Sequence, residues 1–199
     1  RPAVAVVGAR NASSLGIRMA RAMARGLGEA GVVVASGLAR GIDAEAHRAS
    51  LPTGTVAVMA GGVDHVYPEE NRGLAAEIAE RGVLISEHPM GAEPTARHFP
   101  ARNRIVAGLA GAVVVVEAAE RSGTLITARL AGEAGREVLA VPGHPLDPRA
   151  AGCLLLIRDG ATLVRGVDDV LEALGGLGLL GHHEGARAEP EATPDPEPE

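Results

Sequence analysis

The sequence contains no lysine; all 19 of its basic residues are arginine. That absence excludes a Schiff-base lysine and the lysine of a nucleotide-binding P-loop. There is one cysteine, Cys153, so a disulfide framework is excluded and a reducing compartment is expected. No run reaches the roughly 18 apolar residues of a membrane span, and no secretory signal is visible. We therefore expect a cytoplasmic protein with no membrane association.

Aromatic residues are almost absent, with one phenylalanine, one tyrosine and no tryptophan. Phe99 and Tyr67 alone cannot form the aromatic platform on which OB folds and RRM domains stack bases. Metal-ligand spacing is missing as well, because there is no second cysteine and no H-E-x-x-H run. Asp43 and His47 are expected to form a structural pair on one helix, with no nucleophile beside them. We predict no catalytic residues, no metal and no cofactor.

Acidic residues are concentrated at the C-terminal end of the sequence. The net charge is −6, but residues 182–199 hold six acidic residues and one arginine, which leaves 19 acidic and 18 basic residues elsewhere. A nearly neutral body can still carry a local basic groove. Composition therefore predicts one domain at residues 1–174 and a Gly-, Pro- and Glu-rich linker or disordered tail at residues 175–199.

Short apolar runs rich in valine alternate with segments of helix-forming residues. The runs show no apolar–polar alternation, which indicates strands buried on both faces of a sheet. The spacing is that of repeated strand–helix–strand units, so we predict an α/β fold. Its centre is a doubly wound, mostly parallel sheet of extended Rossmann-like type, with helices on both faces. The expected strands are 4–7, 32–35, 55–59, 83–86, 113–116, 137–141 and 162–164.

The stretch 36–43 joins a predicted strand to a predicted helix and contains Ser36, two glycines and an arginine. Such a turn directs backbone N–H groups outward from a helix N-terminus, where the helix dipole favours an anion. Gly37 and Gly41 allow close approach of the backbone to a ligand, and Arg40 adds a planar donor suited to phosphate. The turn is equally compatible with glycines that serve the turn geometry alone.

Other candidate residues follow neighbouring strands, because ligands bind at the carboxyl ends of the strands in such sheets. Gly8 and Arg10 follow the first strand. They do not belong to a G-x-G-x-x-G dinucleotide motif, and no acidic residue ends the second strand, so NAD binding is not expected. From the residues alone, these loops could bind either a nucleic-acid backbone or a free nucleotide.

Two further clusters lie at predicted helix starts. Arg102 and Arg104 flank Asn103. On a helix their side chains diverge by about 200°, so only one of them is expected to reach the same pocket as Arg40. Ser122 and Gly123 precede the next helix, where the serine can donate to an anion. Simple helix capping explains this second cluster equally well.

Taken together, these motifs resemble the Rossmann-like domain of the DNA-processing protein A family, also called DprA or Smf. Several ordered motifs are far more specific than one glycine loop. The matching segments lie within roughly residues 1–170 and are Val6–Arg10, Ser36–His47, Tyr67–Asn71, Ser86–Glu87, Phe99–Leu109, Ser122–Ala128, Arg136–Gly143 and Leu156–Ala161. Family members often carry a small helical domain before this one and a winged-helix domain after it, and the 199 residues contain neither.

The resemblance implies a non-enzymatic protein that binds and protects single-stranded DNA during natural transformation, helps load the RecA recombinase and forms a homodimer through this domain. The family's basic pocket draws on positions matched here by Arg10, Ser36, Gly37 and Arg40. We therefore expect Arg10 and Arg40 to bind phosphates and the Ser36–Gly37 amides to complete the cradle. The other DNA-binding candidates are motif matches whose contact role is less defined: Gly8, Gly41, Arg102, Asn103, Arg104, Ser122 and Gly123.

Two alternatives remain open from the sequence. One is a nucleotide-processing enzyme similar to lysine-decarboxylase-like phosphoribohydrolases. Those enzymes carry a Pro-Gly-Gly-x-Gly-Thr run followed by a glutamate, whereas residues 120–124 here read Glu-Arg-Ser-Gly-Thr. The other alternative is a scaffold whose dimer surface is itself the function.

Overall fold

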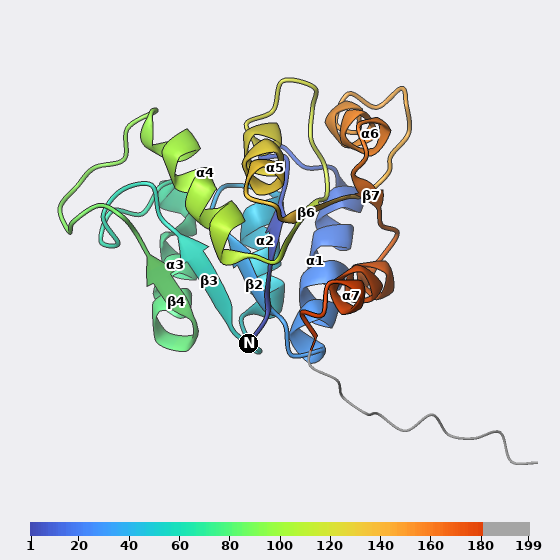
Figure 1. Ribbon diagram of the computed structural model, residues 1–199. Helices are drawn as coiled ribbons and strands as arrows, with labels where there is room; N and C mark the ends of the chain where they lie inside the picture. The colour runs from blue at the N-terminus through green and yellow to red at the C-terminus, as the bar shows by residue number, and fades with distance from the viewer. Residues whose placement is uncertain (181–199) are drawn as a thin grey trace, which may run out of the picture.

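The computed structural model describes residues 1–180 and forms one β-sheet with helices on both faces (Figure 1). The strands lie in the order β4-β3-β2-β1-β5-β6-β7, and all six neighbouring pairs are parallel. The predicted doubly wound parallel sheet is confirmed. The strands are β1 (Ala3–Val7), β2 (Val33–Ser36), β3 (Thr55–Val58), β4 (Val83–Ile85), β5 (Ala112–Val115), β6 (Glu137–Ala140) and β7 (Thr162–Leu163).

The helices connect these strands. They are α1 (Ser14–Glu29), α2 (Ile42–Ser50), the 3-10 helix η1 (Glu69–Asn71), α3 (Arg72–Arg81), α4 (His98–Leu109), α5 (Thr124–Glu133), α6 (Ala151–Arg158) and α7 (Val167–Gly176). The last helix extends past the expected domain end at residue 174. Most of the predicted tail, residues 181–199, lies outside the described residues.

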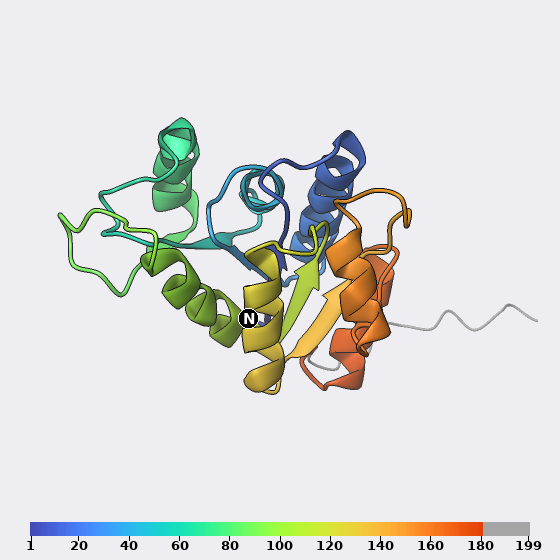
Figure 2. The same ribbon diagram turned by 90° about the horizontal axis from the view of Figure 1, so that it is seen from above.

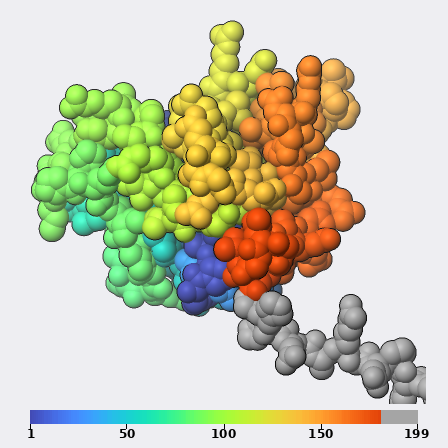
Figure 3. Space-filling model, in the orientation of Figure 1, coloured from blue at the N-terminus to red at the C-terminus, as the bar shows by residue number. Residues whose placement is uncertain are grey.

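Successive residues of each strand point to opposite faces of the sheet, and each face has its own core. Val4 and Val6 of β1 pack with α1, α2 and α7, whereas Ala5 and Val7 pack with α4, α5 and α6. Figure 2 shows α1 and α2 on the opposite side of the sheet from α4 and α5. In Figure 3 the side chains of α4, α5 and α6 hide most of the sheet. The central strands lack apolar–polar alternation because both of their faces are buried, whereas the edge strands β4 and β7 are partly exposed.

Because all strands run in one direction, the loops that follow them gather at one edge of the sheet. The loops after β1 and β2 are joined there, since the N–H of Ile42 donates to the carbonyl of Ala9 at 3.2 Å. Gly41 has φ +70°, and a Cβ at this position would clash with the carbonyl oxygens of Ala9 and Arg10. Glycine is therefore required here both by conformation and by the closeness of the two loops.

No helix among residues 1–180 combines the length and the apolar character needed to cross a bilayer.

Candidate functional site

A pocket of about 310 Å³ lies at the carboxyl ends of β1 and β2. Four segments that are distant in the sequence form it: the loops after β1 and β2, the segment that precedes η1, and the first turns of α4. The lining residues are Arg10, Asn11, Gly37, Ala39, Arg40, Tyr67, Pro68, Phe99 and Arg102. The structure thus brings three of the predicted arginines to one cavity.

Two of these arginines stand at the rim of the pocket and are accessible to a ligand. The side chain of Arg40 is 57% exposed, and its Nε lies 2.6 Å from Oε1 of Glu70, which is also half-exposed. The guanidinium carbon of Arg10 lies 5.6 Å from the centre of the Phe99 ring, within range of a cation–π interaction. An exposed ion pair such as Arg40–Glu70 is worth about 0–1 kcal/mol, so a phosphate can displace Glu70 at low cost.

The pocket also holds the only tyrosine and the only phenylalanine of the chain. Tyr67 and Phe99 meet edge to face, with ring centres 5.4 Å apart and planes inclined by 63°. Both side chains line the cavity, and Arg10 lies over the Phe99 ring. The sequence did not predict this contact, because the two aromatic residues are far apart in the chain and belong to no recognisable aromatic motif. One wall of the pocket is therefore aromatic and the rim is cationic.

Arg102 forms the floor of the pocket and is only 6% exposed. Its Nη1 donates to the carbonyls of Gly37 and Val58, and its Nε donates to Oδ1 of Asn103 at 3.2 Å. Burial lowers the pKa of Arg102, although the nearby Asp43 opposes that effect. Most of its donors are thus bound to protein atoms, and Arg102 holds loops together as well as facing the cavity.

Asp43 and Arg102 hold the peptide groups on the two sides of Gly37. Oδ2 of the buried Asp43 accepts the N–H of Gly37 at 3.2 Å, while the Gly37 carbonyl accepts from Arg102. Burial raises the pKa of Asp43, and Arg102 and neighbouring backbone N–H groups oppose this shift. Ser36 is fully buried, and its hydroxyl donates to the carbonyl of Val6 at 2.7 Å. The Gly37 N–H and the Ser36 hydroxyl are therefore bonded within the protein, and a phosphate cradle formed by the Ser36–Gly37 amides stays a prediction that would require the Gly37 N–H to leave Asp43.

The expected Asp43–His47 pair is also wrong. Nδ1 of His47 lies 2.8 Å from Oγ1 of Thr55, whose hydroxyl donates to the carbonyl of Val34. The Thr55 oxygen must then accept, so His47 carries its proton on Nδ1. Burial lowers the pKa of His47 to about 3, with Arg102 and Arg48 adding to the effect. His47 is a neutral core residue, while Asp43 serves the loop after β2.

The remaining candidates lie outside this cavity. Arg104 points away from Arg102, as their helical separation requires, and its exposed guanidinium pairs with Glu87. Ser122 accepts the N–H of Thr124 at 3.2 Å, so it stabilises the first turn of α5. Gly8 is packed beneath Ile42, where a Cβ would not fit.

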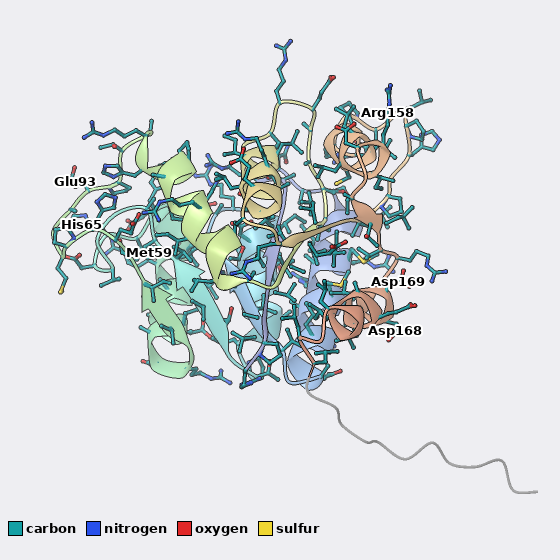
Figure 4. All side chains as sticks on the ribbon, viewed as in Figure 1. Met59, His65, Glu93, Arg158, Asp168 and Asp169 are labelled. Atoms are coloured by element: carbon teal, nitrogen blue, oxygen red, sulfur yellow. The ribbon has the colours of Figure 1, made fainter. Side chains whose placement is uncertain are left out.

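A small hollow borders the pocket on the side of β3. Met59 and His65 line it together with Tyr67, Phe99 and Arg102, which also line the main pocket. Figure 4 places Met59 and His65 on the side of the molecule where α4 begins. The hollow therefore adjoins the pocket at these shared residues.

The order of strands reverses between β1 and β5, where Rossmann-type proteins usually bind nucleotides. Here a carboxylate of the chain occupies the N-terminus of α1. Both the N–H and the hydroxyl of Ser13 donate to Glu117, at 2.9 Å for the N–H, and Ser13 also caps the helix by accepting from Gly16. A carboxylate of the chain therefore lies at the helix N-terminus, where the dipole of α1 favours a negative charge.

A family model for DNA recombination-mediator protein A matches residues 1–175. The chain belongs to the DNA recombination-mediator protein A family. This result confirms the resemblance to DprA and Smf proteins that the sequence motifs indicated. The DNA processing protein DprA of Bacillus subtilis is 44% identical over 173 residues, covering 86% of this chain and 58% of its own length. DprA of Streptococcus pneumoniae is 47% identical over 172 residues, which cover 85% of this chain and 61% of the pneumococcal protein.

Solved structures of the family share the fold. The X-ray structure of DprA from Streptococcus pneumoniae superposes with a TM-score of 0.81 at 45% identity, covering 86% of this chain and 61% of that one. The structure of DNA processing protein A from Helicobacter pylori is described for its unique single-stranded DNA binding mode. It superposes with a TM-score of 0.82 at 28% identity, covering 88% of this chain and 80% of that one. The molybdenum cofactor binding protein of Rippkaea orientalis, at 15% identity and a TM-score of 0.63 over 89% and 97% of the two chains, shares the fold alone.

The chain spans about half the length of the curated relatives it matches, from 46% of the Smf protein of Synechocystis to 61% of the pneumococcal protein.

Proposed function

We propose that this domain binds single-stranded DNA in the pocket formed by Arg10, Arg40, Arg102, Tyr67 and Phe99. The observation that carries the proposal is the convergence of three arginines and both aromatic side chains on one cavity. The family relationship supports it, because the Helicobacter pylori relative binds single-stranded DNA. A surface with a cationic rim and an aromatic wall suits a polymer that has both phosphates and stackable bases.

In this proposal, different parts of a nucleotide contact different residues. Arg40 and Arg10 stand at the rim and bind phosphate oxygens, because guanidinium groups form paired hydrogen bonds with them. Phe99 and Tyr67 form the wall against which a base lies. In a duplex, stacking between neighbouring base pairs covers the faces that the wall would contact, so single strands should bind better than double strands.

We further propose that the protein acts in natural transformation or recombination, as a cytoplasmic homodimer that passes the bound strand to RecA. The family membership supports this role, which needs no bond-breaking step. Two copies linked through this domain would hold one long strand at two pockets, so effective concentration would raise affinity with oligonucleotide length. Measuring the mass in solution with and without oligonucleotide tests the dimer. RecA filament assembly on coated strands, with and without this protein, tests the loading step.

A titration of fluorescently labelled oligothymidylates of increasing length against this chain tests the binding proposal. We expect affinity to rise with length and to fall steeply with salt, with a slope of about −0.7 per phosphate contacted. A blunt duplex of equal length should compete poorly. Equal binding of the duplex, or no binding of any oligonucleotide, would refute the proposal.

The rival function, hydrolysis of a nucleotide, finds little support in the site. Asp43 is buried and bonded to Gly37, and Glu70 at the rim pairs with Arg40. Neither carboxylate lines the cavity. Incubation with nucleoside monophosphates and detection of free base by chromatography would decide in favour of the enzyme if base is released.

A further inference from the structure

Asn71 joins two walls of the pocket through its side chain. The residue ends η1 and is only 3% exposed. Its Nδ2 donates to the carbonyl of Leu38 at 2.9 Å and to that of Ala39 at 3.3 Å. The short segment from Tyr67 to Asn71 thus supplies the aromatic wall at one end and a bond to the loop after β2 at the other.

The loop that Asn71 contacts adopts a conformation that its sequence disfavours. Leu38 has φ +57°, the only positive φ of a non-glycine residue among residues 1–180, and its side chain is fully buried. A left-handed conformation at a residue other than glycine persists only when the surroundings enforce it. The Leu38 side chain is fixed by the apolar core around α3. The backbone carbonyls of Leu38 and Ala39 are fixed by hydrogen bonds from Asn71.

The position of Arg40 depends on this strained turn, because Arg40 comes two residues after Leu38. The carbonyl of Ala39 also accepts the N–H of Ala44, which is in the first turn of α2. Gly37 on the other side of the turn is held by Asp43 and Arg102. Loss of the Asn71 amide would leave the Leu38 carbonyl without this partner and the Ala39 carbonyl with its bond to Ala44 alone, which loosens the part of the loop that carries the rim arginine.

We propose that Asn71 is a positioning residue for the pocket: its amide fixes the distance between the Tyr67–Pro68 wall and the loop that bears Arg40. This inference rests on the proposed binding of single-stranded DNA. Asn71 carries no charge and does not line the cavity. Its effect on affinity must therefore act through geometry, and the number of phosphates that the protein contacts should stay the same when Asn71 is replaced.

The test compares Asn71→Asp with the wild type and with Glu69→Gln, a control in the same segment whose side chain pairs with Arg72 outside the pocket. Aspartate keeps the shape of asparagine but replaces the donor by oxygen atoms that repel both carbonyls. The uncharged Asn71→Ser, measured in parallel, separates the loss of the donor from the added negative charge. We expect about tenfold weaker binding of a labelled oligothymidylate, the consequence of losing buried hydrogen bonds. The salt slope should equal that of the wild type, and Glu69→Gln should bind as the wild type does.

Limited digestion with trypsin gives a second reading that needs no DNA. The chain has no lysine, so trypsin cleaves only after arginine, and Arg40 lies in the loop itself. We expect faster cleavage after Arg40 in Asn71→Asp than in the wild type or the control, because proteases cut locally loosened segments. If circular dichroism shows that the Asn71→Asp substitution unfolds the domain, the neutral Asn71→Ser alone is compared with the wild type and the control.

The outcomes separate this inference from the proposed function. If the wild type binds no oligonucleotide, the proposed function falls, while the digestion still tests the role of Asn71 in the loop. Wild-type affinity together with wild-type cleavage in the Asn71 variants overturns the inference. A reduced salt slope overturns it as well, because it would mean that position 71 acts on a phosphate contact rather than on pocket geometry.

Discussion

Replacing Arg40 by alanine tests the assignment of the rim most sharply. The side chain is more than half exposed and its ion-pair partner, Glu70, is also exposed, so the substitution removes little buried surface. Surface substitutions of this kind change stability by within about 0.5 kcal/mol. A hydrogen bond to a charged group contributes about 1.5–3 kcal/mol, and separating Arg40 from Glu70 costs about 0–1 kcal/mol. The net loss of binding free energy should be about 0.5–3 kcal/mol, which is roughly 2- to 150-fold in affinity.

The assay is fluorescence anisotropy of a labelled oligothymidylate at several salt concentrations. Besides weaker binding, Arg40→Ala should reduce the magnitude of the salt slope by about 0.7, the value for one lost phosphate contact on a single strand. Arg104→Ala is the matched control, because Arg104 is similarly exposed and similarly paired, with Glu87, yet lies outside the pocket. Equal losses in both variants would show that only general charge matters, and no loss in Arg40→Ala would remove Arg40 from the site.

Four other expectations follow from the same structure. Phe99→Leu should weaken binding about three- to tenfold with an unchanged salt slope, because it removes a stacking surface and no charge; a changed slope would contradict this role. The buried thiol of Cys153, with its pKa raised to about 12, should not react with a thiol reagent at pH 8 until urea unfolds the protein. His47 is neutral in the folded protein, where its pKa is about 3, against about 6.5 in the unfolded chain. Its contribution to stability is therefore fully present above pH 6.5 and is lost as the pH falls towards 3. The loss of unfolding free energy is up to about 1.4 kcal/mol per pH unit. Urea unfolding at pH 7 and pH 5 should show this loss in the wild type and a smaller one in His47→Gln. Truncation after Leu180 removes six acidic residues and one arginine, which should tighten DNA binding at low salt.

The fold could be predicted from sequence because its signals are local. The valine run 113–116 and its counterparts are buried on both faces, so each indicates a central strand by itself. The ends of those strands then identify the edge of the sheet at which Arg10 and Arg40 meet. The divergence of Arg102 and Arg104 likewise follows from helix geometry alone.

The chemistry of individual groups in the site could not be predicted in the same way, because it depends on contacts between distant segments. Ser36 and Gly37 have the composition of a phosphate-binding turn, but their polar groups are taken by Val6, Asp43 and Arg102. The two aromatic side chains are isolated in the sequence and meet only through folding. The left-handed residue of the loop after β2 carries no sequence signal, since its conformation is imposed by packing and by hydrogen bonds from elsewhere.

A crystal structure of this domain with a bound oligothymidylate tests the central claim most directly. We predict phosphate oxygens within hydrogen-bond distance of Arg10 and Arg40, and a base against Phe99 and Tyr67 above the buried Arg102. A strand that lies elsewhere on the molecule, with this pocket untouched, would contradict the account.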